Sequence, residues 1–96
     1  MQVKQVKDCM ARKNRFLFLF DKPIMEKDLS IFRHFGVLSI NRAFILPLVK
    51  QNVEGTYMLS TLLGGKQITV DFKTEAAKTE LLPRFSGELQ GIDEAH

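Results

Sequence analysis

The chain has 96 residues, 45% of them hydrophobic and 26% charged, with a net charge of +3 and one cysteine. This length fits one hydrophobic core, so we expect a single domain over residues 1–96, and the composition excludes an intrinsically disordered chain. One cysteine excludes an intramolecular disulfide. No apolar run is long enough to span a bilayer, and both features favour a cytoplasmic protein.

Charge is distributed unevenly along the chain. Residues 1–15 hold five cations and one acid, a local charge of +4, whereas residues 71–96 hold six acids and three cations, a local charge of −3. A small domain polarised in this way orients in an electric field, which suits a flat anionic partner such as a membrane face. The alternative is that the cluster is only a solvated end of the chain. The N-terminal cations are Lys4, Lys7, Arg12, Lys13 and Arg15.

The first third of the chain predicts two strands. Residues 2–7 (QVKQVK) have the pattern of a weak edge strand, and the basic residues 10–14 (MARKN) predict an exposed connection. Residues 15–20 (RFLFLF) are apolar on both faces of any strand, which is typical of a central strand covered on both sides. Pro23 then limits this strand, because proline cannot donate to a ladder.

The segment from residue 21 to residue 49 leaves two interpretations open. Residues 30–49 can form two or three short strands, broken at Gly36, at Asn41-Arg42 and at Pro47. Apolar residues at helical spacing are also present in residues 21–36, where Asp21 could cap a helix and Gly36 could end it. The helical reading makes the domain an α+β sandwich of ferredoxin-like type. Its residues are Asp21, Met25, Leu29, Phe32, Phe35 and Gly36.

The last third predicts a hairpin followed by a helix. Residues 56–63 and 66–73 flank Gly64-Gly65, a pair that supplies the positive φ of a tight turn. Thr74 can cap a helix whose apolar stripe would lie on the sheet. Pro83 falls inside this helix and predicts a kink or an early end. The stripe consists of Ala77, Leu81, Phe85 and Leu89.

Several stretches together resemble a known family. Residues 15–25 (RFLFLFDKPIM) resemble the second strand of pleckstrin-homology (PH) domains, especially those that follow the catalytic domain of Dbl-type guanine nucleotide exchange factors. Residues 31–46 look like the third and fourth strands, and residues 56–82 are similar to the closing hairpin and C-terminal helix. The resemblance implies a mainly β fold, a bent antiparallel barrel of seven strands capped by one C-terminal helix.

The resemblance also gives the basic cluster a role. PH domains that bind phosphoinositides use a Lys-Xn-Lys/Arg-X-Arg motif between the first two strands, which Lys4, Lys13 and Arg15 match, with Lys7 and Arg12 as helpers. Residues two apart in a strand point to the same side, so Lys13 and Arg15 would project together. The implied function is non-catalytic recruitment to a phosphoinositide membrane, as a cytoplasmic, peripheral membrane module in signalling. Because many PH domains bind proteins instead, protein–protein scaffolding is the alternative.

No residue set in the sequence points to catalysis. There is no phosphate-binding glycine loop, no zinc-ligand spacing among Cys9, His34 and His96, and no nucleophile–base set. We therefore expect no enzyme and no cofactor. The ferredoxin-like alternative would allow nucleic-acid binding through aromatic residues on the sheet. We expect no nucleic acid as partner, because the unbroken apolarity of RFLFLF favours burial.

Overall fold

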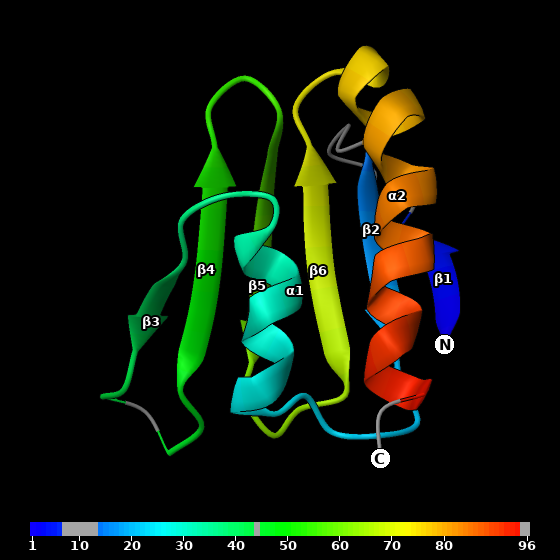
Figure 1. Ribbon diagram of the computed structural model, residues 1–96. Coiled ribbons are helices and arrows are strands. Elements are labelled where there is room, and N and C mark those ends of the chain that lie inside the picture. The colour runs from blue at the N-terminus through cyan, green and yellow to red at the C-terminus, as the bar shows by residue number, and fades with distance from the viewer. Residues whose placement is uncertain (7–13, 44, 95–96) are drawn as a thin grey trace.

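The computed structural model describes residues 1–6, 14–43 and 45–94, and within them the strands form one antiparallel sheet in the order β1-β2-β6-β5-β4-β3 (Figure 1). All five neighbouring pairs are antiparallel. The strands are β1 (Gln2–Gln5), β2 (Arg15–Leu19), β3 (Ser39–Asn41), β4 (Leu48–Val53), β5 (Tyr57–Leu62) and β6 (Gln67–Phe72). A short 3-10 turn, η1 (Glu26–Asp28), leads into α1 (Leu29–Arg33), and α2 (Glu75–Glu94) closes the described chain.

The two α-helices lie on the same face of the sheet, so the domain has two layers (Figure 1). The core fills the space between these layers, and alternate strand residues supply it. Phe85 of α2 lies at its centre, with its ring close to those of Phe18, Phe35, Tyr57 and Phe72. Burial of these rings holds α2 on the sheet.

The predicted barrel of seven strands is wrong. The described residues form six strands in an open sheet, with β1 and β3 at its edges. The physical reason lies in residues 26–33, which the resemblance assigned in part to a strand. They are helical, because the Asp28 carboxylate accepts the Met25 N–H at 2.8 Å and the helix buries Leu29 and Phe32 on one side.

The helical interpretation of residues 21–36 is therefore correct for residues 26–33, which form η1 and α1, and wrong for residues 21–25, which are not helical. The ferredoxin-like fold that we attached to it is not observed. That fold runs βαββαβ, whereas here a hairpin precedes the first helix and a four-strand meander follows it. The coarser expectation holds: the structure is mainly β, with an antiparallel sheet and a C-terminal helix.

The hairpin and the C-terminal helix are confirmed. β5 and β6 pair across a turn in which Gly64 has φ 88°, a conformation that glycine adopts without strain. The Thr74 hydroxyl accepts the Ala77 N–H at 3.0 Å, and the predicted apolar stripe is buried. The early end at Pro83 is wrong, because α2 continues through it to Glu94.

The prediction for residues 15–20 is half right. β2 is an interior strand of the sheet, between β1 and β6. Its phenylalanines are buried under the helices, but Leu17 and Leu19 on the other side are only half-buried. The apolar run therefore does not indicate two covered faces, since both helices lie on one side.

Two polar contacts tie the layers together. Gln51 of β4 is 1% exposed; its amide Nε2 donates to the Phe32 carbonyl at 2.9 Å, and its Oε1 accepts the Tyr57 hydroxyl at 2.5 Å. At the other end of the sheet, Asp93 of α2 lies 2.9 Å from the Met1 amino group. This ammonium group holds the pKa of the Asp93 carboxyl below its usual range. Both contacts fix helix positions over the strands.

Candidate functional site: the open face of the sheet

The face of the sheet opposite the helices carries no described helix, and we call it the open face. Its members follow from the register: residues that pair with one another share a face, and faces alternate along each strand. The open-face strand residues are Gln2, Lys4, Arg15, Leu17, Leu19, Ser39, Asn41, Leu48, Lys50, Asn52, Met58, Ser60, Leu62, Gln67, Thr69 and Asp71.

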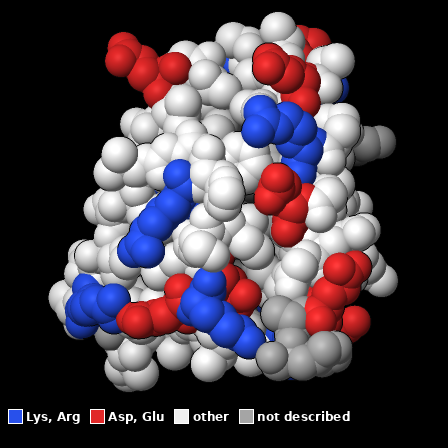
Figure 2. All heavy atoms as spheres, in the orientation of Figure 1, with Lys and Arg blue, Asp and Glu red and all other residues white. Residues whose placement is uncertain are grey.

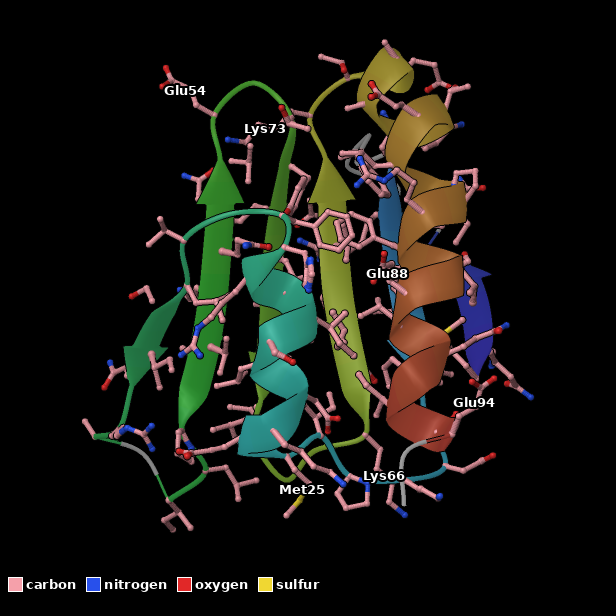
Figure 3. The ribbon with its side chains drawn as sticks, in the orientation of Figure 1. Met25, Glu54, Lys66, Lys73, Glu88 and Glu94 are labelled. Atoms are coloured by element: carbon pink, nitrogen blue, oxygen red, sulfur yellow. The ribbon has the colours of Figure 1, made fainter. Side chains whose placement is uncertain are left out.

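The open face is basic. Its strand residues include three cations, Lys4, Arg15 and Lys50, but one acid, Asp71. Two more lysines lie beside it at opposite ends of β6 (Figure 3): Lys66 lines a hollow in this face, and Lys73 donates from Nζ to the open-face residue Asn52. Glu54, in the turn between β4 and β5, is an acid at the upper end of the sheet.

The helical layer has the opposite sign. α2 contains five acids and two cations, and five minus two leaves a charge of −3 on one helix. Figure 2, which views the helical side, shows acidic side chains interspersed with basic ones and no continuous basic area among the described residues. Among the described residues, the charge difference therefore lies between the two layers, with a basic open face and an acidic α2.

Arg15 and Asp71 form an ion pair across β2 and β6. The guanidinium Nε and one terminal nitrogen donate to the two carboxylate oxygens at 2.7 and 3.1 Å. Both side chains are about one-third exposed or less, at 27% and 32%. The paired carboxylate neutralises much of the charge that Arg15 brings to the open face.

The structure places two of the five predicted head-group residues. Lys4 is exposed on β1, and it shares the open face with Arg15. Lys7, Arg12 and Lys13 lie outside the described residues, so the predicted common direction of Lys13 and Arg15 stays a prediction.

Sequence reasoning missed three cations of this surface, Lys50, Lys66 and Lys73. The alternation of apolar and polar residues along β4 could have placed Lys50 on a solvent-exposed face. Its place beside Ser60 and in one row with Lys4 depends on the strand order, which no local pattern predicts. Non-local pairing therefore builds most of this site.

The open face has a hollow of about 360 Å³ near the β5–β6 turn. Its lining includes the hydroxyls of Ser60 and Thr69, the Gln67 amide and the Lys66 ammonium. These groups are hydrogen-bond donors, and phosphate or sugar oxygens accept such bonds. The hollow can therefore receive a small anionic or hydroxylated group, with Leu48 and Leu62 as its apolar side.

Three further observations limit the chemistry of the described residues. None of the open-face positions holds an aromatic residue, so this face offers no platform on which bases stack. Within residues 1–6, 14–43 and 45–94, no three His, Cys, Asp or Glu side chains gather in a way that could hold a metal ion. In the same part of the chain, no helix combines the length and apolarity needed to cross a bilayer.

A scan against protein-family models finds no match for this chain, and neither do searches of curated proteins and of solved structures.

Proposed function

We propose that this domain is a non-catalytic module that docks on an anionic membrane with the open face of its sheet. The observation that carries the proposal is the charge difference between the layers: five cations and Asp71 on or beside the open face, against a charge of −3 on α2. An anionic surface attracts the first layer and repels the second, so the domain approaches in one orientation.

The size of the attraction follows from the four lysines on and beside the open face, since the charge of Arg15 is offset by Asp71. A lysine near an anionic leaflet contributes about 1 kcal/mol. Lys4, Lys50, Lys66 and Lys73 together contribute about 4 kcal/mol, which corresponds to a dissociation constant near the millimolar range. Direct hydrogen bonds from the hollow to a head group would strengthen this binding.

Phosphoinositide as the favoured lipid is a narrower part of the proposal. It rests on the resemblance of residues 4–15 to the PH-domain motif, with Lys4 and Arg15 on the open face. Lys7, Arg12 and Lys13 belong to this part of the proposal as the other predicted head-group residues. The protein is then a cytoplasmic, peripheral membrane protein. Nucleic acid is a poorer fit, because the described open face has no aromatic side chain for stacking.

Vesicle sedimentation with matched charge variants tests the proposal. Lys4→Ala/Lys50→Ala removes two cations from the open face, and Lys78→Ala/Arg84→Ala removes two from α2. The net charge of the two proteins is therefore the same. On vesicles that contain phosphatidylserine, we expect the first pair to lower the affinity about 30-fold and the second to change it little. Equal affinities for both variants would refute the proposed orientation. Failure of the parent protein to sediment with the vesicles would refute the docking itself.

A second arm of the experiment addresses the lipid. Binding to vesicles that contain phosphoinositide is compared with binding to vesicles whose equal negative charge comes from phosphatidylserine. Both the parent protein and Lys13→Ala/Arg15→Ala are measured. A preference for phosphoinositide that this variant abolishes supports head-group contact by the predicted cluster. Equal binding to both vesicles means that surface charge alone is recognised. Steeply salt-dependent binding to oligonucleotides in place of vesicles would favour nucleic acid as the partner.

A further inference from the structure

One end of the sheet exposes large aliphatic side chains, which we call the aliphatic tip. Its members are Met25, Ile45, Leu46 and Leu62, with exposed fractions of 50%, 101%, 43% and 41%. They come from three separate parts of the chain: the segment after β2, the β3–β4 connection and the end of β5. Exposed apolar side chains gathered from several loops mark an interaction site more often than scattered ones do.

Backbone hydrogen bonds hold these three segments together. The Gly64 N–H donates to the Ile24 carbonyl at 2.7 Å, and the Ile24 N–H donates to the Gly65 carbonyl at 2.8 Å. The Leu63 N–H donates to the Pro47 carbonyl at 3.0 Å. Leu46 reaches the same turn, since its Cδ2 would lie 3.4 Å from a Cβ at Gly64. Hydrogen bonds thus join the three segments that carry the tip side chains.

The tip lies at one end of the sheet, where its side chains are open to solvent. Ile45 is fully exposed, and Met25 lies at the lower end of the molecule in Figure 3, beyond the start of α1. Exposed apolar side chains at the end of a domain enter a soft apolar medium without needing a complementary pocket. The boundary between lipid head groups and acyl chains is such a medium.

The surroundings of the tip favour an anionic bilayer over an apolar protein surface. Leu62 and Lys66 line the same hollow of the open face, so the tip continues directly into the basic surface. Figure 3 shows Lys66 at the same lower end as Met25. Lysines beside inserted aliphatic residues keep their ammonium groups at the head groups while the stems lie in the apolar layer.

We infer that the aliphatic tip enters the acyl boundary of an anionic bilayer while the open face lies against the head groups. This inference rests on the proposed function and adds the part of the chain that penetrates the lipid. The inferred partner of the tip is lipid. Binding of a second copy of this chain, or of another protein, to the tip would contradict the inference.

The absence of tryptophan from the sequence allows a direct test. Ile45→Trp places a single fluorophore in the tip. Val37→Trp is the matched control, because Val37 is also exposed, at 88%, but follows α1 at the opposite end of β3. Both proteins are mixed with vesicles of phosphatidylcholine and phosphatidylserine, with and without brominated acyl chains. Fluorescence is recorded and the bound fraction is measured by sedimentation.

We expect a blue shift and bromine quenching for vesicle-bound Ile45→Trp and neither effect for Val37→Trp. Sedimentation without any change in the Ile45→Trp emission would overturn insertion and leave docking by the open face intact. Failure of both proteins to sediment would refute the proposed function itself. A blue shift that appears without vesicles and grows with protein concentration would assign the tip to self-association and overturn the inference.

A second variant separates insertion from folding. Ile45→Asp/Leu46→Asp puts two charges on the tip at two exposed positions, of which Ile45 buries no surface in the free protein. We expect an unchanged circular dichroism spectrum and at least a tenfold loss of vesicle affinity. The loss should persist at high salt, where attraction between exposed charges is screened. A folded variant with the parent's affinity at high salt would contradict insertion.

Discussion

Arg15 and Asp71 face each other across β2 and β6, and the guanidinium binds both carboxylate oxygens. Asp71 is the one acid among the open-face strand residues that the structure describes, so this pair sets how positive the surface is. A residue expected to bind phosphate is thus already bound to a carboxylate, and its contribution depends on that carboxylate.

Asp71→Asn should therefore strengthen membrane binding. The substitution keeps the shape of the side chain and an oxygen acceptor for Arg15, but it removes one negative charge from the open face. One extra unit of positive charge near an anionic leaflet contributes about 1 kcal/mol, which corresponds to about fivefold tighter binding. The stability cost should stay below about 1 kcal/mol, because the pair is partly exposed. Vesicle sedimentation and thermal unfolding measure the two effects, and an unchanged affinity would place the Arg15 end outside the contact.

The buried contact between Tyr57 and Gln51 should matter for stability. Tyr57→Phe removes the hydroxyl and leaves the Gln51 Oε1 without this donor at a site that is 1% exposed. An orphaned buried acceptor costs about 1–3 kcal/mol, and each kcal/mol lowers the melting temperature of a domain this size by about 4–8 °C. Ser30→Ala is the control, because it removes an exposed hydrogen bond to the Lys27 carbonyl. Equal melting temperatures for the two variants would contradict the role of the buried contact.

Tyr57 is the one tyrosine of the sequence, so its ionisation can be followed by ultraviolet absorbance without interference. Burial disfavours the charged phenolate and raises the pKa of Tyr57 to about 12 from an ordinary value of 10.0. The raised pKa contributes stability that is fully present below pH 10.0 and is lost as the pH rises toward 12. We expect folded protein to titrate about two units above protein in denaturant, while it stays folded. Titration of the folded protein near 10 would mean that Tyr57 is solvated.

Local patterns predicted the elements whose signals are local. The glycine pair between two alternating strands gave the β5–β6 hairpin, and Thr74 with the stripe through Phe85 gave α2. Residues 26–33 show the limit of such reasoning. Their apolar spacing fits a helix, but the resemblance to a β family outweighed it. The cap that we assigned to Asp21 is not formed there; the helical segment starts at η1, where the Asp28 carboxylate accepts the Met25 N–H.

The candidate site was less predictable than the fold. Lys4 and Arg15 lie on one face of the sheet, and the pairing of Arg15 with Asp71 joins residues 56 positions apart. Lys50 joins them only because β4 lies in the same sheet as β1. The aliphatic tip also brings together three loops that are distant in sequence. Such surfaces are set by strand order, which no single segment encodes.

The most direct test of docking by the open face is a nuclear magnetic resonance map of the residues that contact lipid. Isotope-labelled protein is titrated with anionic bicelles that contain phosphoinositide, and the backbone amide signals are followed. We predict large changes in the middle row of the open face, at Lys50, Ser60 and Thr69, in addition to those at the aliphatic tip. Changes confined to the exposed side of α2, around Glu80 and Arg84, would contradict it.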